Sequence, residues 1–135
     1  MEYKLLVKKA IESREKAYTP YSNFKVGAAL QTKSGKIYTG CNIECASYGA
    51  TNCAERTAIY KAVSEGDKEI LAIAVVGAPE EYTYPCGICR QVIVEFGKEI
   101  KIIIAQTEED YKVYNIKELL PNSFSPEDLT ERECT

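Results

Sequence analysis

The 135-residue sequence contains no histidine. This absence excludes a Ser-His-Asp triad, a Cys-His protease pair and every metal site that depends on imidazole ligands. Proton transfer by this chain must therefore use Glu, Asp, Lys, Tyr or Cys side chains. Any zinc ion must be held mainly by thiolates.

The sequence also lacks a basic cluster and a long apolar run. The formal net charge is −3, so electrostatics gives no reason to expect a nucleic-acid partner. No apolar run approaches the length of a membrane span, and Met1-Glu2-Tyr3-Lys4 does not begin a signal peptide. We therefore expect a cytoplasmic protein without membrane contact. Because repeats and linkers are missing too, residues 1–135 are predicted to form one domain.

Cysteine, by contrast, is plentiful, with six in the chain. Three of them lie in the motifs Cys53-Ala54-Glu55-Arg56 and Cys86-Gly87-Ile88-Cys89, on either side of an apolar segment at residues 70–76. This order predicts helix, buried strand and helix, which can bring the three thiols together at two adjacent helix N-termini. Three protein ligands and one open position are typical of catalytic zinc, whereas structural zinc takes four.

Other interpretations of the cysteines stay open at this point. Each thiol can be a small buried apolar residue, and Cys86-x-x-Cys89 can be a redox pair. A non-catalytic binding module is a further alternative, with a structural zinc held by Cys41, Cys45, Cys86 and Cys89. That module would leave Cys53 without a role.

Two charged residues follow Cys53 directly. Glu55 can complete a capping box with Asn52. It can equally reach a water at the metal and act as general base and then acid. Arg56 places a positive charge in a first helical turn, where the helix dipole disfavours it. Because zinc with three thiolates is net negative, we expect Arg56 to offset that charge, the alternative being an arginine that faces solvent.

Candidate ligand-binding residues lie outside these motifs. Asn42 and Glu44 are two residues apart, so in an extended segment their side chains point the same way and can bind vicinal hydroxyls. Ordinary loop polarity is the alternative for this pair. Phe24, Tyr48 and Phe124 are each either stacking faces or plain apolar contacts.

The hydrophobic pattern predicts an α/β fold. We expect helices over residues 3–18, 53–64, 87–96 and 116–120, and strands over residues 26–32, 37–39, 70–77, 100–105 and 111–115. Asn52 is the expected N-cap of the second helix, and Asn115 with Glu118 the expected capping box of the last. The last two strands are joined too closely for a crossover helix, so they should pair antiparallel. The polar tail from about residue 122 is expected to be loose or to contact another subunit.

Together these motifs resemble the small cytidine deaminases, in the homotetrameric subgroup with an all-cysteine zinc site. The resemblance covers the chain up to about Leu129. It rests on five stretches, at residues 21–30, 40–44, 53–56, 85–91 and 119–124. It implies a three-layer α-β-α sandwich around a mixed five-stranded sheet whose last strand is antiparallel.

The resemblance also implies roles for individual residues. One zinc ion per chain would be held by Cys53, Cys86 and Cys89, with Glu55 as the proton shuttle. The other implied substrate-binding positions are Asn42 and Glu44 for the ribose, Phe24 and Tyr48 for the pocket, the backbone N–H of Ala54, and Phe124 from a neighbouring subunit.

The implied activity is hydrolytic deamination of cytidine and deoxycytidine to uridine and deoxyuridine, with release of ammonia, in pyrimidine salvage. No organic cofactor is needed. A deaminase of a modified cytosine nucleoside such as blasticidin S is the alternative within the class. The sequence departs from the family pattern at Tyr84, where serine is common, and at Cys45, where asparagine is common, which puts the local shape of the pocket in question.

Overall fold

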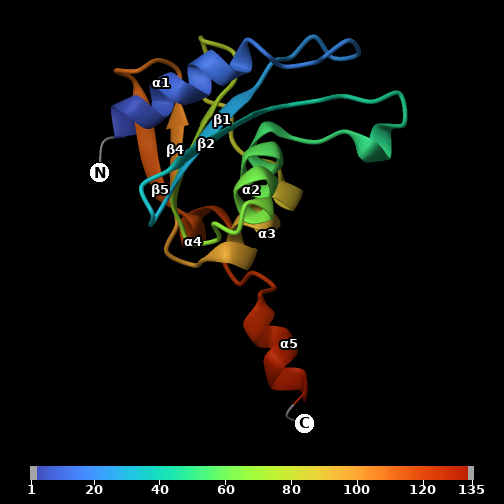
Figure 1. The fold of residues 1–135 in the computed structure, drawn as a ribbon, viewed down its shortest axis with the longest axis vertical. Coiled ribbons are helices and arrows are strands. Elements are labelled where there is room, and N and C mark those ends of the chain that lie inside the picture. Colours follow the sequence, from blue (N-terminus) through green and yellow to red (C-terminus); the bar gives the residue numbers. More distant parts are fainter. Residues whose placement is uncertain (1–2, 134–135) are drawn as a thin grey trace.

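A mixed five-stranded sheet in the order β2-β1-β3-β4-β5 forms the centre of the protein (Figure 1). The structure is a computed structural model that describes the backbone of residues 3–133 and the side chains of residues 3–129. The strands are β1 (Gly27–Thr32), β2 (Ile37–Cys41), β3 (Ile70–Val76), β4 (Lys101–Ala105) and β5 (Tyr111–Asn115). β3 and β4 are parallel, and every other neighbouring pair is antiparallel. The predicted mixed sheet with an antiparallel last strand is confirmed.

Helices cover both faces of this sheet, which gives the predicted three layers. α1 (Tyr3–Arg14) lies on one face, and α2 (Ala54–Ser64), α3 (Gly87–Phe96) and α4 (Ile116–Leu119) lie on the other (Figure 1). Both bonds of the predicted capping box at the start of α4 are present. Within the described residues, no helix is long and apolar enough to cross a membrane.

Strand β3 shows how the sequence supports two hydrophobic layers. Successive side chains of a strand point to opposite faces. Ala72, Ala74 and Val76 accordingly pack with α1, whereas Ile73 and Val75 pack with α2 and α3. The alanines let α1 approach closely, and the larger side chains fill the thicker opposite layer.

The strand directions bring several loops to one edge of the sheet. β2 and β3 are both antiparallel to β1, so their C-terminal ends lie together beside the start of β1. The register confirms this, because Gly27 pairs with both Cys41 and Val76. The segments before β1, after β2 and after β3 therefore converge, and α2 begins at the same edge because it runs back to the start of β3.

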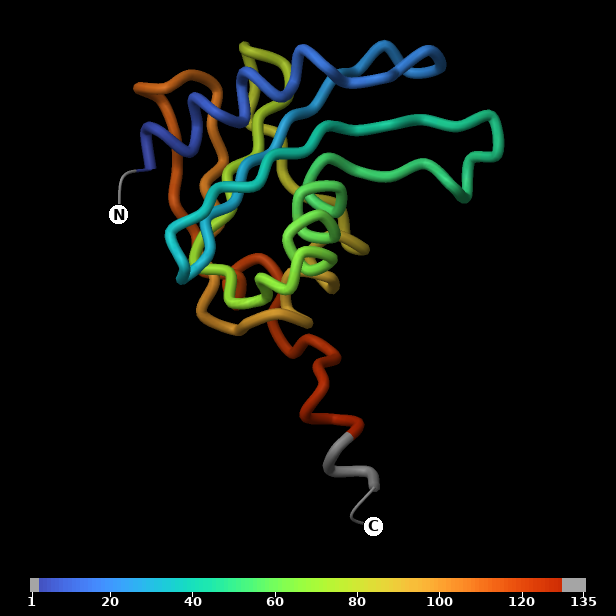
Figure 2. The backbone as a smooth tube through the Cα atoms, in the orientation of Figure 1, coloured from blue at the N-terminus to red at the C-terminus, as the bar shows by residue number. Residues whose placement is uncertain are grey.

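Two of these segments extend away from the sheet edge. Residues 18–24 and 42–52 run side by side, as the blue and teal parts of the tube in Figure 2 show. Their tips touch where the rings of Tyr21 and Tyr48 pack edge to face, with centroids 6.1 Å apart. The second segment contains a short 3-10 helix, η1 (Tyr48–Ala50).

The first helix is shorter than predicted. α1 ends at Arg14 rather than near Tyr18, because long-range contacts at the sheet edge replace further helical hydrogen bonds. The Tyr18 backbone N–H donates to the Asn42 carbonyl at 3.0 Å, and Tyr18 forms a parallel bridge with Ile43. Arg14 Nη1 donates to the Gly77 carbonyl at 2.6 Å, which fixes the end of α1 against β3.

The predicted N-cap of the second helix is wrong. Cys53, not Asn52, is the N-cap of α2. The Asn52 backbone N–H donates to the Ile43 carbonyl at 2.9 Å, and its side-chain Nδ2 donates to Thr57 Oγ1 at 3.2 Å. The backbone and side chain of Asn52 are thus bonded to Ile43 and Thr57. The capping box considered for Asn52 and Glu55 does not form.

Two larger differences remain, whereas the other boundaries agree with the predictions to within one residue. β2 continues two residues beyond Thr39, because Gly40 and Cys41 keep pairing with β1. The tail contains an unpredicted helix, α5 (Pro126–Glu133), which extends away from the body (Figure 1). Its polar composition gave no apolar periodicity to indicate a helix.

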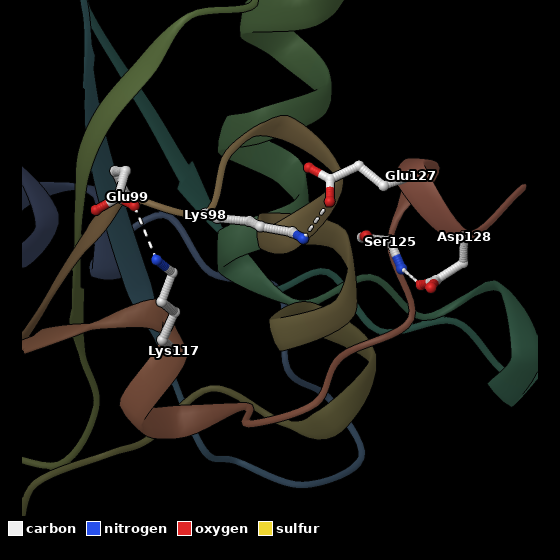
Figure 3. A network of polar contacts seen from close by, with 6 residues as sticks. All are labelled: Lys98, Glu99, Lys117, Ser125, Glu127 and Asp128. Atoms are coloured by element: carbon white, nitrogen blue, oxygen red, sulfur yellow. Dashed lines mark hydrogen bonds and ion pairs between the residues drawn. The ribbon is translucent and has the colours of Figure 1, made fainter. Parts of the chain in front are cut away.

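Polar contacts hold the start of this helix. The Ser125 backbone N–H donates to Asp128 Oδ2 at 2.8 Å, and Glu127 Oε2 pairs with Lys98 Nζ at 2.8 Å (Figure 3). The acidic side chains in its first turn also suit the positive end of the helix dipole.

Candidate metal and active site

Three cysteine sulfurs meet at the N-termini of α2 and α3. Cys53 is the N-cap of α2, Cys86 is the N-cap of α3, and Cys89 lies in the first turn of α3. The three Sγ atoms lie within 4.8 Å of one another, and those of Cys53 and Cys86 are 3.8 Å apart. A tetrahedral zinc with bonds of about 2.3 Å to sulfur would separate two ligand sulfurs by about 3.8 Å. The donor set therefore fits one zinc ion.

The cluster does not include the other cysteines considered for a structural zinc. Across residues 3–133, the metal-binding arrangement joins Cys53, Cys86 and Cys89, while Cys41 and Cys45 are free thiols outside it. The four-thiolate module is therefore not formed. Three ligands leave one coordination position for a group that the protein does not supply, as in catalytic zinc sites.

The surroundings of the cluster favour the thiolate form of Cys53. Arg56 Nη2 donates to Cys53 Sγ at 3.3 Å, and the backbone N–H of Cys89 donates to Cys86 Sγ at 3.4 Å. Hydrogen bonding from Cys89, with a further contribution from Arg56, lowers the pKa of Cys53 to about 5, and the same contact with Cys53 raises the pKa of Cys89. Arg56 Nε is buried and has no hydrogen-bond partner in the described part of the chain.

Glu55 is a buried acid beside this cluster. Its exposed fraction is 4%, and burial is the main cause that raises the pKa of its carboxyl to about 7, with a smaller contribution from Cys53. A carboxyl with a pKa near neutrality can both accept and donate a proton. Glu55 therefore has the property that general acid–base chemistry needs.

A cavity of about 320 Å³ opens where the loops converge at the sheet edge. Seven predicted site residues line it: Phe24, Asn42, Glu44, Cys53, Ala54, Glu55 and Cys86. The residues that the sequence analysis did not assign to the site are Ser22, Val26, Thr51, Asn52, Thr83 and Tyr84. Most of them lie within two residues of a predicted site residue, and Tyr84 is also a departure from the family pattern that affects the shape of the pocket.

Asn42 fastens the segment that precedes β1. Its side-chain Oδ1 accepts from the Val26 backbone N–H at 2.9 Å, and its Nδ2 donates to the Phe24 carbonyl at 2.8 Å. An amide oxygen has two lone pairs and an amide nitrogen two hydrogens, so each end of Asn42 can form one more bond toward the cavity.

Glu44 fastens the same segment nearer its tip. Oε1 accepts from the backbone N–H groups of Tyr21 at 3.0 Å and Ser22 at 3.1 Å, and Oε2 accepts from the Ser22 hydroxyl. The Ser22 hydroxyl is also the main cause that lowers the pKa of Glu44, so this carboxylate is charged at neutral pH. Oε2 keeps capacity for another donor.

One wall of the cavity depends on a glycine at the end of β3. A Cβ atom on Gly77 would lie 2.1 Å from Thr83 Oγ1 and 3.0 Å from Phe24 Cζ. No side chain fits there without displacing Thr83, and Phe24 has little room as well. Gly77 thus lets these two lining residues close over the end of the strand.

Four predicted site residues do not line the cavity in the single chain: Cys89 and Arg56, which belong to the sulfur cluster described above, and Tyr48 and Phe124. Tyr48 is 76% exposed and lines a neighbouring cavity of about 230 Å³ together with Tyr21, Glu44 and Thr51. Phe124 is half exposed, and its carbonyl accepts from Gln91 Nε2 on α3.

The family model described as the cytidine and deoxycytidylate deaminase zinc-binding region matches residues 1–106. The chain belongs to this family. The matched region contains all three clustered cysteines. The zinc-binding region that defines the family therefore agrees with the donor set found here, which fits one zinc ion per chain.

Relatives within the family are similar over nearly their full length. The cytidine deaminase of Halalkalibacterium halodurans is 48% identical, with 97% of this chain and 100% of that protein covered. The probable cytidine deaminase of Dictyostelium discoideum is 46% identical, with 93% and 89% covered. The family resemblance read from the motifs is confirmed.

Solved structures of the family share the fold. The cytidine deaminase of Burkholderia pseudomallei superposes with a TM-score of 0.86 at 49% identity, covering 92% of this chain and 100% of that one. The Mycobacterium tuberculosis enzyme gives 0.82 at 37% identity, with 92% and 98% covered.

Proposed function

We propose that this chain is a zinc-dependent cytidine deaminase that converts cytidine and deoxycytidine to uridine and deoxyuridine, with release of ammonia, in pyrimidine salvage. The observation that carries the proposal is one cavity bordered by a three-thiol cluster and a buried carboxyl, at Glu55, whose pKa is about 7. The names of the similar proteins support the substrate.

Cys53, Cys86 and Cys89 would hold the zinc ion. When bound, the ion supplies a Lewis acid that lowers the pKa of a water to near neutrality. Arg56 would offset part of the negative charge of the three thiolates through its contact with Cys53, and the two helix N-termini would add to this effect.

Glu55 is assigned the proton transfers. Its carboxylate takes a proton from the water that adds to C4 of the pyrimidine and delivers that proton to N3. Glu55 then moves the remaining proton from the oxygen added at C4 to the exocyclic amino group, so that the C4–N bond breaks, ammonia leaves and the C4 carbonyl of the uracil ring forms. The backbone N–H of Ala54, the first residue of α2, is among the amides without an intrahelical partner and can support the base carbonyl or the added oxygen.

The outer part of the cavity is assigned to the sugar. Asn42 and Glu44 would use their remaining hydrogen-bonding capacity for the ribose hydroxyls, and Phe24 would contact the base. Tyr48 would reach the substrate from the adjoining cavity that it shares with Glu44. This arrangement favours a plain nucleoside, in which those hydroxyls are free.

The proposed assembly is a homotetramer in which Phe124 completes the pocket of a neighbouring subunit. Support comes from large apolar side chains that the single chain leaves exposed, among them Tyr18, Tyr60, Ile88 and Phe124. A cytoplasmic location is also proposed, since a cluster of reduced thiols suits a reducing compartment.

The function can be tested by following absorbance on cytidine, deoxycytidine, free cytosine and cytidine monophosphate, with zinc measured in the same preparation. We expect turnover of both nucleosides by protein that carries one zinc per chain. Zinc-loaded protein that turns over neither nucleoside would refute the proposed function.

A further inference from the structure

Tyr84 forms part of the cavity wall and is held by a residue far away in the sequence. Its hydroxyl lies 2.8 Å from that of Tyr114 in β5, so that one tyrosine donates to the other. The two rings pack edge to face, with centroids 5.7 Å apart and an angle of 60° between their planes. Although 39% of Tyr84 is exposed, both its ring and its hydroxyl are engaged.

The partner of Tyr84 is itself fixed. Tyr114 pairs with Ile102 of β4, and its ring packs against the hydrophobic core under α2 and α3. Tyr82, two residues before Tyr84, packs against the same core and donates to Asp110 Oδ1 at 2.5 Å. The segment before Cys86 is therefore attached to the β4–β5 side of the sheet at two points, and only the contact with Tyr114 holds the Tyr84 side chain itself.

Which part of the substrate faces Tyr84 follows from the proposed function, on which this inference rests. In that function C4 of the base lies at the cysteines, and N3 faces Glu55 at the start of α2. C5 is the other ring neighbour of C4, so it points away from α2. Apart from Cys53, the N-cap of α2, the lining residues that come neither from α2 nor from residues 22–26 and 42–52 are Thr83, Tyr84 and Cys86.

We propose that Tyr84, positioned by Tyr114, is a specificity-determining residue that restricts the substituent at C5 of the pyrimidine. A methyl group at C5 would have to displace the Tyr84 ring, and the ring can move only if the contact with Tyr114 breaks. One methyl group in an apolar pocket changes discrimination by roughly 10- to 200-fold.

The experiment compares kcat/KM for 5-methylcytidine with kcat/KM for cytidine. Tyr84→Ala removes the wall, and Tyr114→Phe removes only the hydroxyl that holds it. Tyr82→Phe is the matched control, because it deletes a hydroxyl in the same segment at a residue that does not line the cavity. Zinc content is measured for every variant to show that the metal site is intact.

We expect Tyr84→Ala to raise the ratio of 5-methylcytidine to cytidine by at least tenfold, Tyr114→Phe to raise it more than threefold, and Tyr82→Phe to leave it within twofold. Smaller changes in folded, zinc-loaded Tyr84→Ala overturn the inference. If that variant does not fold, Tyr114→Phe alone decides, and a ratio within twofold of wild type overturns it. Wild-type protein that does not deaminate cytidine refutes the proposed function, and this inference with it. If wild-type protein deaminates cytidine but Tyr84→Ala and Tyr114→Phe leave the ratio unchanged, only this inference is refuted and the proposed function stands.

Discussion

The Arg56 guanidinium donates a hydrogen bond to Cys53 Sγ at 3.3 Å, although Arg56 lies in the first turn of α2, where a positive charge opposes the helix dipole. The contact with sulfur explains this placement. Three thiolates and Zn²⁺ sum to −1, and a more negative site makes a water at the metal harder to ionise. We therefore propose that Arg56 acts on the metal site rather than on the substrate.

Arg56→Gln is expected to lower kcat by roughly 10- to 100-fold and to shift the pH profile of kcat upward, with little change in KM for cytidine. The profile moves upward because the lost positive charge no longer favours ionisation. Arg56→Lys is the matched control, since it keeps the charge without the planar fork and should retain more activity. An increase in KM alone, with kcat and the pH profile unchanged, would show that Arg56 contacts the substrate.

Glu55→Gln is expected to keep one zinc per chain and to lose roughly 100- to 10,000-fold in kcat. The amide has nearly the shape of the carboxyl but cannot take up a proton, and Glu55 lies beside the three cysteines without being one of the clustered ligands. Metal analysis and steady-state kinetics on the same sample check this. Loss of zinc together with activity would mean that Glu55 is a ligand.

Glu44→Ala is expected to reduce kcat/KM for cytidine by roughly 10- to 100-fold and to affect free cytosine far less. Binding energy from the sugar can be used at the reacting carbon, so wild-type protein should also turn over cytosine very poorly. Ser22→Ala separates the two roles of Glu44, because it loosens the residues that Glu44 holds and leaves the carboxylate in place. Equal losses for cytidine and cytosine in Glu44→Ala would count against the ribose assignment.

Light scattering should show an assembly with about four times the 15.1 kDa mass of the chain. Phe124→Ala should then lower kcat/KM for cytidine while the mass stays tetrameric, since the side chain is proposed to complete a neighbouring pocket. A fully active monomer would contradict both the assembly and the role of Phe124.

Stability should fall in acid partly through Asp67. Its Oδ2 accepts hydrogen bonds from Thr32 Oγ1 at 2.7 Å, Ser34 Oγ at 2.8 Å and Tyr38 OH at 3.2 Å. The bond from Thr32 is the main cause that lowers the pKa of Asp67. Because the folded value lies below the unfolded value of about 3.9, this contribution is present above that pH and is lost as the pH falls through the folded value.

Thermal melts of wild type and Asp67→Asn across this range test the effect. We expect a lower Tm for Asp67→Asn at neutral pH and a difference that shrinks as the pH falls below about 3.9. A difference in Tm that stays constant with pH would mean that the charge of Asp67 does not contribute.

The sequence was most informative where local signals and the fold agree. The buried strand at residues 70–76, the antiparallel last pair of strands and the Asn115–Glu118 capping box are all confirmed. The three clustered cysteines could be identified because two short motifs flank one buried strand, and strand order alone then brings them to the same edge.

The predictions failed where contacts between residues far apart in the sequence determine the local structure. Nothing near Arg14 indicates that α1 ends there, because the chain is redirected by the contact of Tyr18 with Asn42. The hydrogen bonds from the backbone of Tyr21 and Ser22 to Glu44 could likewise not be predicted, since more than twenty residues separate the partners. Contacts between distant residues could be predicted where motifs marked both partners, as for the three cysteines, and could not be predicted at Tyr18, Asn52 or Glu44, where no motif did.

Gly77 contributes no functional group to the cavity, but a side chain at this position would change the shape of the cavity. Even alanine would place a carbon 2.1 Å from Thr83 Oγ1 and 3.0 Å from Phe24. A screen for inactive variants should therefore recover Gly77 substitutions about as often as changes at the cysteines. Those variants would keep the three cysteines and Glu55. Their defect would be a cavity of altered shape, caused by the displacement of Thr83 and Phe24.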